Sequence, residues 1–249
     1  MNHTSIASRL RDVFTNAGLP VFAILLAALA PPGVGAEVVT NAVAPAGQAF
    51  IRWTGGNVPL VKTYRNPLVL PDGASLDGVE AVFGPAIYVA TNGVAEADGS
   101  SWENATTLVN AFAIAVDGDV IVISNGTYNA GATLAADRKA ITIRGLTGNR
   151  NDVILSGGHA RRVLTVGGYG KRSVIADVTV AKGANMDGAG AGINAYNAVI
   201  SNCRVTDCIS NNTFCGLAIY ASNWSQVLGC VLDNNRTTTP ISGIFGSYR

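Results

Sequence analysis

Few side chains in this 249-residue chain could do acid–base chemistry. Its only histidines are His3 and His159, which excludes a zinc site or proton relay built from several histidines. The densest polar cluster is His159-Ala160-Arg161-Arg162. A histidine or arginine beside an anionic sugar can bind it and take a proton, so His159, Arg161 and Arg162 are the catalytic candidates. The competing interpretations are a solvated turn after Gly157-Gly158 and a carboxylate-binding rim for an acidic glycan.

The aspartates of the C-terminal half offer little for metal binding or hydrolysis. Calcium takes several hard oxygen ligands, and no Asp-x-Asp motif occurs among these residues. When successive segments of the repeat described below are overlaid, no two carboxylates fall at the same position. We therefore expect these aspartates to be solvated turn residues. They are Asp137, Asp152, Asp177, Asp187, Asp207 and Asp233. We expect no metal and no cofactor, with calcium relevant only if the chain is a lyase.

Two tyrosines are the candidates for binding carbohydrate. Tyr196 and Tyr220 lie 24 residues apart, close to the period of the repeat. We expect both to point outward on neighbouring coils as a short aromatic ladder. Such a surface can stack against sugar rings, although stacked aromatic residues can also serve only to stabilise the coils.

Residues 1–36 have the three parts of a secretory signal. Arg9 and Arg11 precede the apolar stretch 21–30, and Val34-Gly35-Ala36 places small residues before Glu37. Ten apolar residues are too few to span a bilayer, so we expect cleavage rather than an anchor. The sequence predicts a secreted, periplasmic or cell-surface protein with no membrane span after removal of the signal.

The composition narrows the class further. Only 13% of the residues are charged while 48% are hydrophobic, which argues against both a disordered chain and a helical bundle. The formal net charge is +1, so we expect no nucleic-acid partner.

The elements that must position these side chains are mostly strands. Residues 37–85 combine short apolar runs with turn signals and form an N-terminal strand-rich segment. Asn104 can cap a single helix over 105–116. Short strands separated by Gly, Asn and Asp are expected at 87–89, 120–123, 140–144, 153–155, 163–166, 174–180, 199–205 and 227–232.

The strands repeat at about 25 residues. Val180, Val205 and Leu232 follow at 25 and 27, and Cys203 falls on Cys230. A second column follows at 27, 24 and 27 and contains Val166, Ile193, Leu217 and Ile244. A period of this length without intervening helices predicts a parallel β-helix, in which like residues of successive coils stack into apolar ladders.

Four cysteines lie within 28 residues: Cys203, Cys208, Cys215 and Cys230. An even number in an exported chain permits two disulfides. The stacking of Cys203 on Cys230 favours a rung of buried thiols, and a disulfide between them is the alternative.

Several motifs give the architecture a family likeness. Asp98-Gly99-Ser100-Ser101-Trp102, the expected helix, Gly118-Asp119-Val120-Ile121-Val122 and Asn125-Gly126-Thr127-Tyr128 follow one another. This order resembles the opening of exported right-handed parallel β-helix proteins, which are similar to pectate lyases in fold. Residues 140–145, 153–158 and 197–203 resemble their later coils. The resemblance covers 86–249 and implies the fold but no activity, because this scaffold carries lyases, hydrolases, adhesins and phage fibres.

We therefore expect an all-β, right-handed parallel β-helix over 86–249 with one short capping helix. The expected function is a non-catalytic secreted or cell-surface module that contacts a polysaccharide or cell-surface glycan. The alternatives are a polysaccharide lyase or glycoside hydrolase with degenerate or missing catalytic coils, and a structural stalk. Residues 241–249 enter a new coil and stop, so we expect an incomplete C-terminal end or end-to-end self-association.

Overall fold

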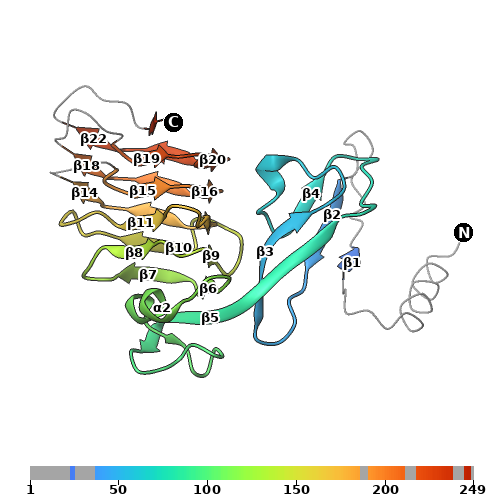
Figure 1. Ribbon diagram of the computed structural model, residues 1–249, viewed down its shortest axis with the longest axis horizontal. Helices are drawn as coiled ribbons and strands as arrows, with labels where there is room; N and C mark the ends of the chain where they lie inside the picture. The colour runs from blue at the N-terminus through green and yellow to red at the C-terminus, as the bar shows by residue number, and fades with distance from the viewer. Residues whose placement is uncertain (1–22, 26–36, 186–189, 211–216, 238–243, 248–249) are drawn as a thin grey trace, which may run out of the picture.

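The computed structural model describes residues 23–25, 37–185, 190–210, 217–237 and 244–247. Most of the chain forms a parallel β-solenoid, in which successive coils stack on one another (Figure 1). A smaller N-terminal segment of antiparallel strands lies beside the solenoid and is joined to it through one long strand. The parallel solenoid and the mostly strand content confirm the predicted fold class.

One long sheet, here sheet I, runs the length of the solenoid and continues into the N-terminal segment. Its strand order is β20-β16-β12-β9-β6-β5-β3. The strands are β3 (Gln48–Thr54), β5 (Glu80–Val94), β6 (Val120–Ile123), β9 (Thr142–Gly145), β12 (Ser173–Ala176), β16 (Ala198–Ser201) and β20 (Gln226–Leu228). Only the β3–β5 pair is antiparallel.

Three further parallel sheets complete the coils. Sheet II contains β7 (Gly126–Asn129), β10 (Val153–Ser156), β13 (Thr179–Ala181), β17 (Arg204–Thr206) and β21 (Val231–Asp233). Sheet III contains β8 (Leu134–Asp137), β11 (Leu164–Gly167), β15 (Ile193–Tyr196), β19 (Ile219–Ser222) and β23 (Ile244–Ser247). Sheet IV is a short one between them, with β14 (Ala184–Asn185), β18 (Ile209–Ser210) and β22 (Arg236–Thr237).

The N-terminal segment has its own small core. The antiparallel strands β1 (Ala23–Leu25), β2 (Val38–Ala42) and β4 (Leu68–Leu70) form one sheet, and η1 (Leu60–Lys62) is a short 3-10 turn. Phe50 and Trp53 of β3 pack against the leucines of β4. Strand β1 falls within the expected signal sequence, and the rest of 1–36 lies outside the described residues.

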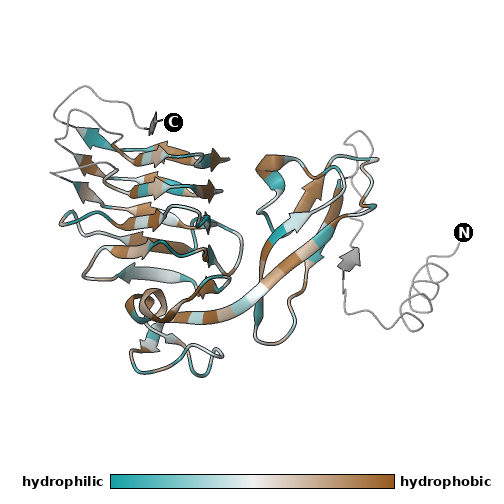
Figure 2. Ribbon diagram, in the orientation of Figure 1, coloured by the Kyte–Doolittle hydropathy of each residue, from teal (hydrophilic) through white to brown (hydrophobic). Residues whose placement is uncertain are grey.

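Apolar ladders fill the interior of the solenoid. Ile121, Ile143, Ile175 and Ile200 lie opposite one another on sheet I, and each is fully buried. On sheet II, Val180 pairs with Val205 and Val205 pairs with Leu232, which confirms the first predicted column. Figure 2 shows hydrophobic residues recurring along the strands of successive coils. Parallel strands in register place like side chains about 4.8 Å apart, so each rung covers its neighbours.

The second predicted column is shifted by two residues in two of its members. Leu164, rather than Val166, pairs with Ile193, and Ile219, rather than Leu217, follows Ile193 and precedes Ile244. Both residues of each competing pair are buried: Leu164 and Val166 in one coil, and Leu217 and Ile219 in another. Residues two apart on a strand face the same side, so either member of a pair could fill the column. The apolar pattern alone therefore could not separate the two registers.

The helix begins later than predicted. Helix α2 spans Leu108–Ile114, and its N-cap is Thr107, whose hydroxyl accepts from the Asn110 N–H. Asn104 instead donates its side-chain amide to Asp98 within the preceding loop. Ala105 and Thr106 hydrogen-bond to Val94 and so cannot join the helix. The apolar face of α2 packs into the solenoid core and covers its N-terminal end (Figure 1).

Each of the long strands expected at 174–180, 199–205 and 227–232 is two strands with a corner between them. Asp177, Asn202 and Gly229 occupy this corner in successive coils, with φ values of 61°, 50° and 59°. Glycine adopts this left-handed conformation freely, and Asp and Asn tolerate it better than most residues. The corner turns the chain from sheet I to sheet II.

The corner aspartate corrects the expectation that the aspartates are solvated. Asp177 is fully buried, and one of its carboxylate oxygens accepts from the Arg144 guanidinium at 2.6 Å. The other accepts from the Asn202 amide at 2.8 Å. Arg144 also donates to the Phe50 carbonyl at 2.9 Å and lies 4.9 Å from the centre of the Phe50 ring. This buried pair therefore ties the solenoid to the N-terminal segment.

The cysteines on the described residues behave as core side chains. Cys203, Cys208 and Cys230 are free thiols, and Cys203 and Cys230 stack on neighbouring coils as predicted. Burial raises the pKa of Cys208 to about 12, so its thiol stays protonated and unreactive at neutral pH. Cys215 lies outside the described residues.

The buried pair predicts a specific stability pattern. Asp177→Gly keeps the left-handed corner but leaves Arg144 without its counter-charge, and we expect it to lower the free energy of unfolding by about 3–5 kcal/mol. Asp177→Asn retains an acceptor and the corner, so it should cost less. Urea denaturation of both variants measures the difference. Equal stability of Asp177→Gly and the wild type would contradict this role.

Candidate functional site

A groove runs over the outer face of sheet III. Its volume is about 600 Å³. Residues from four successive coils line it: Asp137, Arg138, Thr165, Val166, Gly167, Gly168, Tyr169, Asn194, Tyr196, Tyr220, Ser222 and Asn223. Both tyrosines singled out in the sequence are among them.

The groove follows from the alternation of side chains on parallel strands. Residues that point out of the core form two outward rows along the solenoid axis. One row contains Ala135, Thr165, Asn194 and Tyr220, and the other contains Asp137, Gly167, Tyr196 and Ser222. Tyr196 is thus opposite Ser222, and Tyr220 is opposite Asn194. The two tyrosines share a face as predicted, but they are not directly stacked as a ladder.

A third tyrosine completes the aromatic part of the groove. Tyr169 lies in the turn after β11, and its ring centre is 4.8 Å from that of Tyr196, with the planes tilted by 57°. It is 83% exposed. Sequence reasoning missed this residue, although the glycine-rich run Gly167-Gly168-Tyr169-Gly170 is a signal for a projecting turn.

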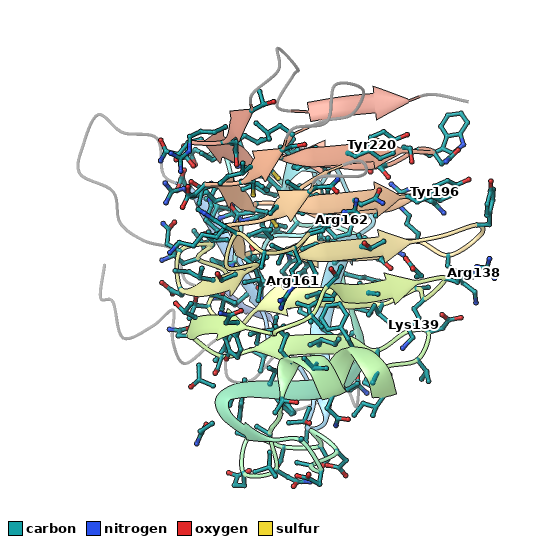
Figure 3. All side chains as sticks on the ribbon, turned by 90° about the vertical axis from the view of Figure 1, so that its left-hand side faces the viewer. Arg138, Lys139, Arg161, Arg162, Tyr196 and Tyr220 are labelled. Atoms are coloured by element: carbon teal, nitrogen blue, oxygen red, sulfur yellow. The ribbon has the colours of Figure 1, made fainter. Side chains whose placement is uncertain are left out.

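The groove is nearly neutral. Asp137 and Arg138 are the only charged residues in its lining, and they lie side by side at the end of β8. Figure 3 shows Tyr196 at the C-terminal end of its sheet III strand and Tyr220 on the strand of the next coil, with Arg138 and Lys139 lower on the same side. Lys139 does not point its charge into the groove lining: its amine donates to the backbone carbonyl of Phe112, in α2, at 2.7 Å. The remaining polar lining consists of hydroxyl and amide groups.

The structure does not bring the three catalytic candidates into the groove. His159 lies at a corner with φ of 56°, and its Nε2 is 3.1 Å from a carboxylate oxygen of Asp207. Arg236 contacts the other oxygen of Asp207 at 3.2 Å. Arg162 donates from Nε to the Gly190 carbonyl at 2.9 Å. Neither Arg161 nor Arg162 is in the groove lining. Figure 3 shows Arg162 near the sheet III strands that carry Tyr196 and Tyr220, with Arg161 farther from them.

The other aspartates make local pairs. Asp233 accepts from Arg204 at 2.6 Å, and this contact lowers the pKa of Asp233 and raises that of Arg204. Asp152 accepts from Thr147 and Asn149 in a turn. Asp187 lies outside the described residues. Across the ranges that the structure describes, no three His, Cys, Asp or Glu side chains are grouped as a metal site would require, and no helix is long and apolar enough to cross a membrane.

No protein-family model, no curated protein and no solved structure matches this chain. The site is therefore interpreted from its own geometry.

Two glycines in the turn that carries Tyr169 should respond differently to substitution. Both have positive φ, but a Cβ on Gly167 would lie 1.8 Å from the Tyr196 carbonyl oxygen, whereas one on Gly170 would have open space. We expect Gly170→Ala to cost about 1–2 kcal/mol and Gly167→Ala about 2–5 kcal/mol, because only the latter adds a backbone clash to the strain. Urea denaturation measures both. Equal costs would show that the turn does not pack on β15 as described.

Proposed function

We propose that this chain is a non-catalytic, carbohydrate-contacting module of an exported parallel β-helix protein. The finer assignments, a right-handed coil of the pectate-lyase-like kind and a secreted or cell-surface location, belong to the same proposal. The observation that carries it is the groove on sheet III with Tyr169, Tyr196 and Tyr220 in or beside its lining.

The chemistry of the lining suits sugars. Aromatic rings offer an apolar face to the C–H groups of a pyranose ring, while hydroxyl and amide groups can bond its hydroxyls. The groove supplies both kinds of group: three tyrosine rings, and the side chains of Thr165, Asn194, Ser222 and Asn223. This combination favours a glycan over an apolar or highly charged ligand.

The shape of the groove favours a polymer over a single sugar. The two outward rows cross successive coils, and neighbouring coils are about 4.8 Å apart. Similar outward positions therefore recur at this spacing along the solenoid axis. A chain laid along this axis would meet Tyr220 in one coil and Tyr196 and Tyr169 in the two coils before it.

The groove favours binding over hydrolysis. Glycoside hydrolysis generally uses a pair of carboxylates on either side of the scissile bond. Among the described residues that line the groove, Asp137 is the single carboxylate, and Arg138 is its neighbour. His159 is paired with Asp207 at a corner outside this lining.

The tyrosines should determine glycan affinity. We expect Tyr196→Ala and Tyr220→Ala each to weaken binding to the best polysaccharide of a neutral and acidic panel about tenfold, equivalent to about 1.4 kcal/mol. Affinity electrophoresis gives the ranking and biolayer interferometry the constants.

Leu60→Ala is the control for these variants. Leu60 is an exposed apolar residue of η1 outside the groove lining, so its loss should leave polysaccharide affinity unchanged. Tyrosine variants that bind as well as the wild type would contradict the assignment. A wild type that binds no glycan would favour the structural stalk.

The lyase or hydrolase alternative predicts turnover. We expect no new unsaturated or reducing ends when the protein is incubated with polygalacturonate or alginate, with or without calcium. The groove lacks the second carboxylate that hydrolysis uses, and its lining contains none of the candidate bases His159, Arg161 and Arg162. Chromatography of the products over a day tests this. Turnover that is lost in His159→Ala would overturn the binding-only function and place catalysis at the His159–Asp207 corner.

A further inference from the structure

A second cleft lies where the N-terminal segment meets sheet I. Its volume is about 320 Å³. Its lining comes from the end of β2 through the start of β3, from Asn66 before β4, from β5 and the following loop, and from β6, β9 and the residue after β9. It shares no residue with the groove on sheet III. Figure 1 shows the N-terminal segment beside the strands of sheet I, where these elements meet.

The walls of this cleft combine apolar and aromatic side chains with the polar residues Gln48, Asn66 and Arg144. Trp102 and Tyr88 contact each other with ring centres 4.7 Å apart. Trp102 is 39% exposed, and Leu146, also in the lining, is 50% exposed. The lining also contains four alanines and a proline: Ala42, Ala44, Ala46, Ala49 and Pro45. Because these side chains are small, they leave the volume of the cleft open to a ligand.

A buried charge lies in the same lining. Arg144 is only 5% exposed, and two of its five N–H groups donate to Phe50 and Asp177. Because Arg144 lines the cleft, we expect its remaining N–H groups to reach a ligand oxygen there. Arg65 is close enough for its charge to act on both Arg144 and Asp177, so the two cations outweigh the single carboxylate. A single negative charge in the cleft would balance this group.

We propose that the cleft binds a small ring compound that carries one carboxylate. The ring packs against Trp102, and the carboxylate accepts from Arg144. An aromatic acid and a uronic acid both have this chemistry, and a volume of about 320 Å³ is close to the lower end of the usual range for ligand pockets. This site is independent of the glycan groove and does not rest on the function proposed for that groove.

Isothermal titration calorimetry of the full chain tests the proposal with four probes. They are 4-hydroxybenzoate and glucuronate, with benzyl alcohol and methyl glucoside as neutral counterparts. We expect at least one acid to bind in the millimolar range or tighter, and its neutral counterpart to bind at least about tenfold more weakly. Whichever acid binds identifies the source of the carboxylate.

Substitutions locate the binding site. Trp102→Ala should weaken binding of the acid about tenfold, and Ala46→Phe should block it by filling the cleft without touching Arg144. Trp224→Ala is the matched control, because Trp224 is 72% exposed and lies outside this lining. Circular dichroism checks that each variant is folded.

Three results would overturn the proposal. They are binding of neither acid, equal affinity for an acid and its neutral counterpart, and unchanged affinity in both folded cleft variants. Tyr196→Ala separates this outcome from that of the glycan groove, since it should leave the acid's affinity unchanged.

Discussion

The in-register stacking of parallel coils is the constraint on which the rest of the structure depends. Each strand of the solenoid bonds to the equivalent strand of the next coil, so a column of residues must share one environment. The interior columns are therefore apolar, as at Ile143, Ile175 and Ile200. The corner between sheets I and II adopts left-handed backbone in three successive coils, at Asp177, Asn202 and Gly229. The outward columns form continuous rows, and rows on a solenoid make grooves along its axis.

This constraint explains which parts of the fold the sequence could predict. A column such as Val180, Val205 and Leu232 is readable because the core residues two positions earlier repeat at the same 25- and 27-residue spacings, so both columns give one register. Those earlier residues are Val178, Cys203 and Cys230. Leu164 and Val166 both face inward, so sliding a coil by two residues gives an equally apolar interior. Only the lengths of the turns between strands select the register, and those lengths vary. For the same reason Tyr220 lies opposite Asn194 rather than opposite Tyr196, although it is on the predicted face.

The site was predictable to the same extent. The side of a strand on which a residue lies depends only on the local alternation of side chains. The outward positions of Tyr196 and Tyr220 could therefore be predicted from the sequence. Tyr169 projects from a turn, and its contact with Tyr196 has no periodic signature. Asp177 was wrongly expected to be solvated, because its burial depends on Arg144 from an earlier coil and on the N-terminal segment that Arg144 contacts. No repeat analysis contains that information.

The two proposed binding surfaces arise from the solenoid in opposite ways. The groove on sheet III exists because the repeat is regular, and its residues are contributed one coil at a time. The cleft at sheet I exists because the regularity is broken, where an N-terminal segment covers an outward face that would otherwise meet water. Covering that face buries Arg144, which then needs a carboxylate. The corner column accepts Asp, Asn or Gly for its backbone, so a carboxylate could be placed at Asp177 with little added backbone strain. A position imposed by coil geometry thus became the electrostatic anchor of the attached segment.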